Sequence, residues 1–482
     1  MTGAACQDAG VSDLITSRAV PPDAAWHAEL AWLPDGVRAD VLIEAAGGRF
    51  TAVTPGVPAS AVPAGVAGLA GLTLPGLANA HSHAFHRALR GATQSGRGTF
   101  WTWRDRMYEV AARLTPGSYR ALATAVYAEM ALAGITCVGE FHYLHHGPDG
   151  APFGDPNEMG QALAAAAAVA GVRITLLDTC YLSGGLSPAG EPVPLSRAQL
   201  RFGDGDAAAW ADRASALRPG PGTRIGAAIH SVRAVPPGQL GPVVEWARER
   251  GAPLHVHLSE QRAENEACLA AYGRTPAGVL HQADALGPRT TAVHATHLSA
   301  ADLALLGRSA TFACFCPTTE ADLADGIGPA SALAAAGSRL TVGSDSQAVI
   351  DLFEAARRIA QGERLVTQER GHFTAADLAR AATAAGHASL GWPEAGELAP
   401  GALADLVTVA LDTPRTAGAA AATALESVIF GASAADVRHV VAGGRQIVRD
   451  GRHLLVGDVP GALSAAISAV LAWPAAALAV LA

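Results

Sequence analysis

Histidines at positions suited to metal binding and acid–base chemistry are the most informative residues of this 482-residue chain. Twelve of the 17 histidines lie between His81 and His297, and several of them stand near the ends of short apolar runs. His81 and His83 are two residues apart, and such residues of a strand point to the same side, so both imidazoles can bind one metal ion. An HxH pair alone is a weak signal, and it needs further ligands.

Three other motifs supply those ligands. His257 ends an apolar run and is followed three residues later by Glu260. His294 ends another run, and the run RLTVGSDS contains Asp345. Three imidazoles and a carboxylate with an open position suit catalytic zinc, although iron or manganese would also fit. The metal ligands that we predict are His81, His83, His257 and Asp345. His255 competes with His257, which is preferred because it lies nearer the end of its run.

The remaining groups match the needs of hydrolysis. A metal ion lowers the pKa of water and makes it nucleophilic near neutral pH. The reaction then needs a base for the water proton and an acid for the leaving nitrogen. We assign Asp345 to the first role and Glu260 to the second, while His294 orients the water or stabilises its charge. The three catalytic residues predict hydrolysis of a C–N bond.

Eight short apolar or β-branched runs, each followed by a helical pattern, must position these groups. The runs lie near residues 77–83, 135–143, 173–181, 224–231, 253–260, 291–297, 309–316 and 339–346. Such alternation predicts an α/β fold with a (β/α)8 barrel of the TIM type, whose active site lies at the carboxyl ends of the strands. A doubly wound open sheet is the alternative, but it usually carries a glycine-rich turn after its first strand. Here the first strand ends in histidines.

The flanks of the barrel differ in pattern. Alternating residues broken by Asp-Gly and Gly-Gly turns predict β-hairpins, and another hairpin is expected to turn at Gly443-Gly444. We expect segments 20–74 and 392–456 to pair into a small β-sandwich domain, with the hydrolase barrel at 75–391. The apolar segment 457–482 is interpreted as a docked helix and tail rather than a membrane anchor.

Composition narrows the classes of partner and compartment. Half of the residues are apolar, 16% are charged and the net charge is −9, which fits a folded protein with a large core. No basic stripe is present, so we expect neither nucleic acid nor a membrane as partner. Six cysteines in so long a chain, and an N-terminus without a secretory signal, predict a cytoplasmic protein with reduced thiols.

These motifs in this order resemble the amidohydrolase superfamily, in particular its single-metal deaminases. Within it the chain is similar to the formimidoylglutamate deiminases, through the strings LPGLANAHSHAFHRALRG, FWTWRDRMYEVAARLTP, GEFHYLHHGPDG, AIHSVRAVPP, HVHLSEQ, HATHL and CPTTEADLADG. The resemblance covers nearly the whole chain except about the first and last 20 residues. It implies one Zn²⁺ per subunit, hydrolytic deimination of N-formimino-L-glutamate in histidine degradation, and a homodimer.

The resemblance also implies a set of substrate-binding residues. Arg104 and Arg233 would bind the two carboxylates of the substrate, because guanidinium groups pair with carboxylates through two hydrogen bonds. Tyr143 and His230 would add hydrogen bonds. One position departs from the family, which carries glutamine where this chain has His86. The residue still offers a hydrogen bond, but its reach and charge differ, which affects substrate preference rather than reaction class.

Three other functions were weighed. A deaminase of purines, pterins or triazines would use the same metal site but would need aromatic walls more than paired arginines. A binuclear amidohydrolase would need a bridging Lys or Glu on the fourth strand, and the run RIGAAIHS has neither. A metal-binding protein without catalysis would be expected to lack Glu260, His294 or Asp345. The sequence therefore favours the formimidoylglutamate deiminase reaction.

Overall fold

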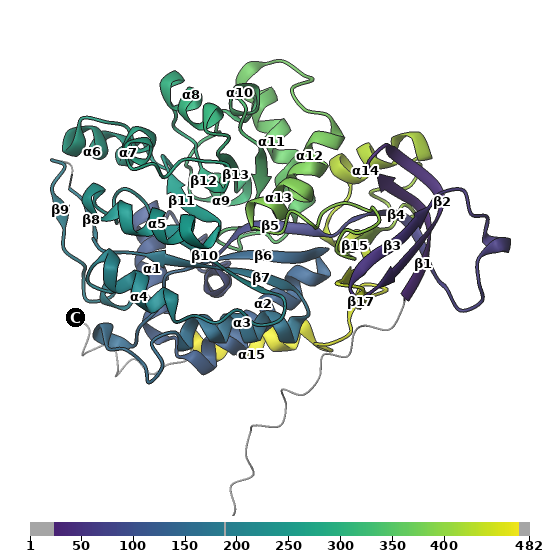
Figure 1. The fold of residues 1–482 in the computed structure, drawn as a ribbon, viewed down its shortest axis with the longest axis horizontal. Helices are drawn as coiled ribbons and strands as arrows, with labels where there is room; N and C mark the ends of the chain where they lie inside the picture. The colour runs from purple at the N-terminus through teal and green to yellow at the C-terminus, as the bar shows by residue number, and fades with distance from the viewer. Residues whose placement is uncertain (1–23, 188, 472–482) are drawn as a thin grey trace, which may run out of the picture.

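The computed structural model describes residues 24–187 and 189–471. Segments 20–23 and 472–482, which the sequence analysis assigned to the β domain and the tail, lie outside these residues. Figure 1 shows two parts side by side, a strand-and-helix barrel and a smaller sheet that contains strands from both ends of the chain.

The larger part is a parallel barrel of eight strands. These are β5 (Leu77–Ser82), β6 (Ile135–His142), β7 (Arg173–Cys180), β10 (Thr223–Ile229), β11 (Leu254–Leu258), β12 (Thr290–His294), β13 (Phe312–Phe315) and β14 (Leu340–Val342). Each pairs with its neighbour in chain order, and a parallel bridge between Ser82 and Asp345 joins the first strand to the segment after the last. The predicted (β/α)8 barrel is confirmed. An open doubly wound sheet is excluded, because its strand order would reverse.

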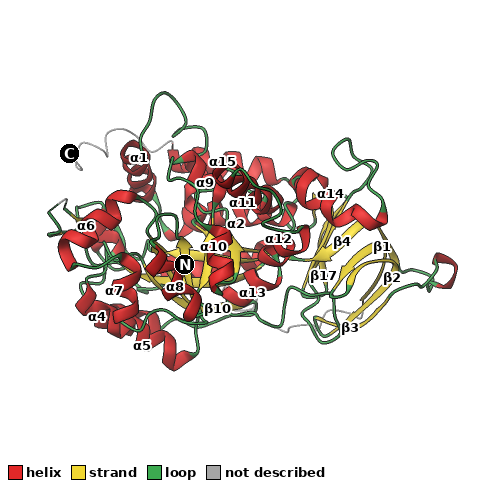
Figure 2. Cartoon of the chain, turned by 90° about the horizontal axis from the view of Figure 1, so that it is seen from above, coloured by secondary structure: helices red, strands yellow, loops and turns green. Residues whose placement is uncertain are grey.

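Helices surround the strands, as Figure 2 shows from above. They are α1 (Phe100–Arg113), α2 (Pro116–Leu132), α3 (Glu158–Ala170), α4 (Ala207–Ser215), α5 (Leu240–Arg250), α6 (Arg262–Tyr272), α7 (Pro276–Gln282), α8 (Ala300–Arg308), α9 (Pro317–Asp322), α10 (Ala330–Ala336), α11 (Leu352–Thr367), α12 (Ala375–Ala382) and α13 (Ala384–Ser389). A short hairpin of β8 (Gly185–Leu186) and β9 (Pro192–Val193) follows β7.

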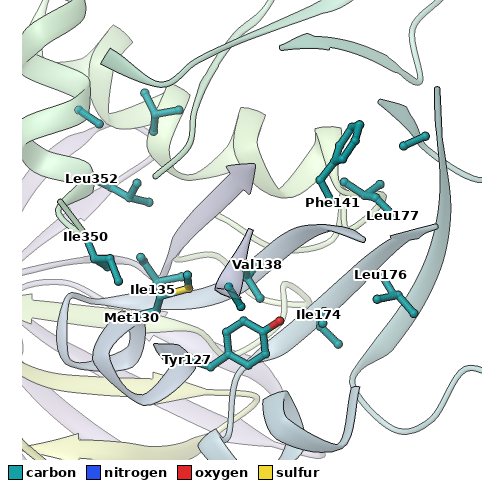
Figure 3. Packing of buried hydrophobic residues seen from close by; sticks show 14 of the residues in the cluster. Tyr127, Met130, Ile135, Val138, Phe141, Ile174, Leu176, Leu177, Ile350 and Leu352 are labelled. Carbon is teal, nitrogen blue, oxygen red and sulfur yellow. The ribbon is translucent and has the colours of Figure 1, made fainter. Parts of the chain in front are cut away.

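Burial on both faces explains why the barrel strands have mostly apolar sequences. Every residue of β5, β6, β7 and β11 is buried. Parallel strands covered by helices are apolar on both sides for this reason. Figure 3 shows part of the packing, in which Tyr127 and Met130 of α2 share one cluster with Val138 of β6 and Ile174 of β7.

The smaller part is a mixed sheet with the order β18-β17-β16-β15-β4-β1-β2-β3. Its strands are β1 (Ala24–Leu33), β2 (Gly36–Ala46), β3 (Arg49–Thr54), β4 (Ala67–Pro75), β15 (Leu406–Val409), β16 (Val437–Ala442), β17 (Arg445–Arg449) and β18 (Arg452–His453), with α14 (Ala424–Gly431) between β15 and β16. Gly443 and Gly444 turn the hairpin between β16 and β17 with φ angles of 57° and 78°, which a two-residue turn of this kind requires. The sheet has a core of its own that includes Trp26, Ile43 and Phe50.

Helix α15 (Val459–Leu471) ends the described part of the chain and packs along α2. Arg113 donates a hydrogen bond to the carbonyl of Leu471 at 3.1 Å. Among the described residues, no helix has the length and apolarity that a membrane crossing requires. The first half of the predicted C-terminal segment is therefore a docked helix.

Asp405 joins the smaller sheet to the barrel. Its carboxylate is fully buried next to β15 and pairs with Arg173 of β7. It also accepts hydrogen bonds from Gly443 N at 2.7 Å and from the Thr136 hydroxyl at 3.2 Å. One carboxylate therefore holds a barrel strand and a hairpin of the flanking sheet in place.

We predict that Asp405→Ala lowers the free energy of unfolding by about 3–5 kcal/mol, because it leaves the largely buried Arg173 charge without its counterion. Urea denaturation measures the change. Asp35→Ala, which removes an exposed ion pair with Arg38, serves as the control and should cost less than about 1 kcal/mol. Equal denaturation midpoints for Asp405→Ala and the unmodified protein would show that the Asp405–Arg173 ion pair contributes nothing to stability.

Candidate active site

The predicted metal ligands meet where the barrel closes. His81 lies near the end of β5, and the backbone N–H of Asp345 donates to its carbonyl at 3.0 Å. The N–H of His83 donates in turn to the carbonyl of Asp345 at 3.1 Å. His257 lies near the end of β11, on the opposite side of the barrel. All four side chains are buried.

The donor atoms form two overlapping groups, His81 with His83 and Asp345, and His81 with His257 and His294, each within 4.8 Å. Nε2 of His81 lies 3.3 Å from Oδ1 of Asp345, and Nε2 of His83 lies 3.4 Å from the same oxygen. Nε2 of His257 lies 3.1 Å from Nε2 of His81. Imidazole nitrogens and a carboxylate oxygen at such spacing are donors that suit a catalytic metal ion such as zinc.

The protonation states of these groups suit a cation. Nδ1 of His83 and of His257 each lie 2.9 Å from a backbone carbonyl, of Phe141 and His230 respectively, so each Nδ1 carries the proton and leaves Nε2 bare. Burial lowers the pKa of His81, His83 and His257. Burial disfavours ionised Asp345, but the hydrogen bond and charge of His81 outweigh it and hold the pKa of this carboxyl below its usual value. The residues present therefore fit a divalent metal ion.

His255, the competing ligand, lies outside this cluster. Its Nε2 forms a 3.0 Å hydrogen bond with the carbonyl of Ser389, the last residue of α13. Burial lowers the pKa of His255 to about 3, so the ring is neutral. The structure thus places His257, and not His255, among the donor atoms.

His294 and Glu260 lie beside the donor atoms. Nε2 of His294 is 3.8 Å from Oδ2 of Asp345 and 3.8 Å from Oε1 of Glu260. His294 has a φ of 67°, a left-handed conformation that is uncommon outside glycine and turns its side chain at the strand end. Its Nδ1 lies 3.3 Å from Oε1 of Glu320 on α9, a partner that the sequence analysis did not identify. The three predicted catalytic groups are thus in mutual reach.

A cavity opens next to this cluster. All five residues predicted to bind substrate line it, together with the predicted ligands His83, His257 and Asp345 and the predicted catalytic residues Glu260 and His294. The predicted five are His86, Arg104, Tyr143, His230 and Arg233. The wall also contains aromatic residues that the sequence analysis did not assign: Trp103, Tyr108, Tyr181 and Phe202. Tyr181 directly follows β7, so the strand-end rule could have found it, and Tyr108 lies one helical turn after Arg104.

Charge inside the cavity is concentrated at Arg233. Its Nη2 lies 3.7 Å from Oε2 of Glu260, and its Nε lies 3.7 Å from Oε1 of Glu264. Burial lowers the pKa of Arg233, but the two carboxylates outweigh it and raise the value. His86 forms a 3.0 Å hydrogen bond with the Tyr143 hydroxyl, and burial lowers its pKa to about 3. The cavity therefore offers a permanent cation and a neutral imidazole.

The histidines after the second strand do not line this cavity. His142, His145 and His146 are buried behind it, and none lines this cavity. His142, His145 and Asp178 are close enough to hold a metal ion, but Arg213 donates two hydrogen bonds to Asp178 at 2.9 and 3.0 Å. Because Arg213 already neutralises this carboxylate, the group is a buried ionic network.

Comparisons with known proteins agree with this fold and site. Residues 72–447 match the family model described as "Amidohydrolase family". A formimidoylglutamate deiminase from Pseudomonas aeruginosa is 38% identical over 88% of this chain and 95% of its own length. An 8-oxoguanine deaminase from the same species is 30% identical over 72% of this chain and 76% of its own length. The crystal structure of an amidohydrolase from Brucella melitensis superposes with a TM-score of 0.84 at 32% identity, covering 93% of this chain and all of the other.

The chain therefore belongs to the amidohydrolase family, as its motifs indicated. It is a hydrolase that acts on C–N bonds, and the family is metal-dependent. The ligand set and the catalytic roles named above stay predictions for this chain.

We predict that the metal-free protein binds one equivalent of Zn²⁺ and that His83→Asn weakens this binding by removing one of four donors. Equilibrium dialysis with elemental analysis measures the stoichiometry. His145→Asn is the matched control, because it alters a buried histidine of the second cluster and should leave one equivalent bound. Two equivalents in the unmodified protein, reduced to one by His145→Asn, would contradict our interpretation of that cluster.

Proposed function

We propose that this enzyme hydrolyses N-formimino-L-glutamate to N-formyl-L-glutamate and ammonia, using a single zinc ion per chain. The observation that supports this proposal most directly is one cavity with a metal-ligand cluster and two arginines, Arg104 and Arg233, in its wall. The P. aeruginosa relative, named a formimidoylglutamate deiminase, covers nearly the whole chain. Histidine degradation would be the corresponding process.

The substrate carries two carboxylates and a formimino group. Arg233 follows β10 and Arg104 lies on α1, so the two guanidinium groups reach the cavity from different elements. Guanidinium groups bind carboxylates with paired, charge-assisted hydrogen bonds. Tyr143 and His230 also line the cavity and can donate or accept further hydrogen bonds. We therefore assign these four residues to substrate binding, with His86 as a fifth contact.

The metal ion is proposed to be zinc, since nitrogen-rich sites with one carboxylate suit it, although iron or manganese is compatible with the same donors. When bound, it supplies Lewis acidity that makes water nucleophilic near neutral pH. His81, His83, His257 and Asp345 would hold it. Their buried, fixed positions exclude bulk water from the reacting atoms.

The protons are moved by the chain's own groups. Asp345 accepts a proton from the attacking water on its Oδ2, which faces His294 at 3.8 Å. His294 orients the water through Nε2, since Glu320 fixes the ring from the Nδ1 side. Glu260 carries a proton to the formimino nitrogen, which leaves as ammonia. Water first adds across the C=N bond, and its second proton then reaches the same nitrogen as the C–N bond breaks. The =NH group thus gains both protons and leaves as NH3, and the oxygen stays as the formyl C=O, so atoms and charge balance.

A related deaminase acting on a purine, pterin or other small polar substrate is the second candidate. The aromatic residues Trp103, Tyr108, Tyr181 and Phe202 favour it, because flat rings stack on such walls. The relative named 8-oxoguanine deaminase, at 30% identity, shares the family. The half-buried Arg233 favours the first candidate, because a neutral ring offers no carboxylate to this cation.

We further propose a cytoplasmic homodimer without nucleic-acid or membrane partners. Every cysteine among the described residues is free and buried, which supports a reducing compartment. The net charge of −9 opposes binding to polyanions. The homodimer follows the family resemblance alone.

We expect the zinc-loaded protein to release ammonia from N-formimino-L-glutamate and not from guanine or adenosine. Glu260→Gln should lower kcat by about 10²–10⁴-fold, because glutamine cannot carry the proton to the leaving nitrogen. Coupled ammonia detection measures both. Glu266→Gln, on the neighbouring helix α6, is the control and should retain activity. Release from a purine alone would move the substrate assignment to the second candidate.

Arg233→Met should raise KM for N-formimino-L-glutamate by about 10–100-fold, because a charge-assisted hydrogen bond to a carboxylate contributes roughly 1.5–3 kcal/mol. The change in kcat should be smaller. Steady-state kinetics with the substrate and with formimino compounds that lack one carboxylate separate the two effects. An unchanged KM for the full substrate would remove Arg233 from carboxylate binding.

A further inference from the structure

A directional chain of hydrogen bonds runs behind the metal-ligand cluster. Asn79 Nδ2 donates to Ser344 Oγ at 2.6 Å, and Ser344 Oγ donates to Gln347 Oε1 at 2.8 Å. Gln347 Nε2 donates to Ser82 Oγ at 2.9 Å, and Ser82 Oγ donates to Glu140 Oε2 at 2.8 Å. All five side chains are fully buried or nearly so.

Backbone groups fix the direction of this chain. Ser344 N donates to Asn79 Oδ1 at 2.9 Å, so the amide nitrogen of Asn79 must face the serine hydroxyl. Gln347 Nε2 also donates to the carbonyl of Asp345 at 3.0 Å, and a carbonyl can only accept. At the far end, Ala84 N donates to Glu140 Oε1 at 2.6 Å. Each amide is therefore locked in one orientation, and the successive bonds polarise one another.

The hydrogen-bond chain connects the two segments that carry the predicted ligands. Ser82 lies between His81 and His83, whereas Ser344 directly precedes Asp345. The backbone in the second segment is strained, since Asp345 and Gln347 have φ angles of 45° and 59°. Such conformations cost about 1–3 kcal/mol each and persist only when the surroundings hold them. Gln347, which bonds to both segments, supplies that support.

We propose that this hydrogen-bond chain positions the metal ligands, with Gln347 as its central positioning residue and Glu140 as its terminal acceptor. The inference rests on the proposed metal centre. None of the five residues is among the predicted ligands. Side chains that hold ligands in place from outside the donor set typically account for 10–100-fold in metal affinity. The hydrogen-bond chain would thus set the affinity for the metal ion and the geometry of its ligands.

The test compares two Gln→Asn substitutions at left-handed positions. Gln347→Asn keeps an amide that tolerates positive φ but is one methylene too short to reach Ser82. Gln368→Asn is the control, because Gln368 has a φ of 60° and is exposed at the end of α11, where it bonds only to the nearby Leu365 carbonyl. Affinity for Zn²⁺ is measured by competition with a chromophoric chelator, and ligand geometry by the visible spectrum of the Co²⁺-substituted protein.

Gln347→Asn should weaken Zn²⁺ binding by about 10–100-fold and shift the Co²⁺ spectrum, while Gln368→Asn changes neither. Unchanged affinity and spectrum in Gln347→Asn would overturn the inference. If Gln347→Asn does not fold, Glu140→Gln carries the same test, because one carboxylate oxygen becomes an NH2 group that cannot accept, so either Ser82 or Ala84 N loses its acceptor. Failure of the unmodified protein to bind Zn²⁺ would instead overturn the proposed metal centre, so the two failures are distinguishable.

Discussion

Closure of the barrel is the constraint on which the site depends. The predicted ligands come from the first strand, the fifth strand and the segment after the eighth. The pairing of Ser82 with Asp345 joins the first strand of the barrel to the segment after the last. Close backbone approach is essential at this seam. A Cβ on Gly343 would lie 2.8 Å from the His81 carbonyl oxygen and 3.0 Å from the Cys316 sulfur, so any larger residue would push the strands apart.

Burial then determines the protonation states of the predicted ligands. Removing the imidazoles from water keeps them neutral, while the same burial would tend to protonate Asp345. The hydrogen bond from His81 counters that tendency, and the pKa of the carboxyl stays below its usual value. Neutral nitrogens and one ionised oxygen are what a divalent cation requires of its ligands. The packing that closes the barrel therefore also sets the protonation states of the predicted ligands.

The sequence was sufficient for the barrel, because its alternation of strands and helices follows local rules, and the same rules led to the predicted donor set. Strand-like runs alternate with helical patterns, and ligands stand at the ends of those runs. His142 shows the limit of the strand-end rule, because it ends β6 but does not line the cavity. Phe141 contacts the rings of His81 and His257, so it faces the barrel interior, and the next residue must face the helices, where it lies near Tyr119 of α2. Counting side-chain alternation from Phe141 would have placed His142 correctly.

Glu320 could not be identified in the same way. It lies on α9, a helix of six residues, and reaches His294 only because the loop after β13 folds back over the strand end. No spacing in the sequence encodes that contact between two separate βα units. The wall residue Tyr108 is a similar case, since its place in the cavity depends on where α1 lies in the fold.

The departure at His86 is best understood through its environment. In the formimidoylglutamate deiminases that the chain resembles, this position carries a neutral amide. Burial lowers the pKa of His86 to about 3, and the Tyr143 hydroxyl occupies its Nε2 at 3.0 Å. The imidazole is therefore neutral near pH 7 and retains Nδ1 for a further hydrogen bond. Neither glutamine nor a neutral histidine brings charge to the cavity. The substitution therefore changes the reach of the side chain, and the positive charge that a dianionic substrate requires still comes from the arginines.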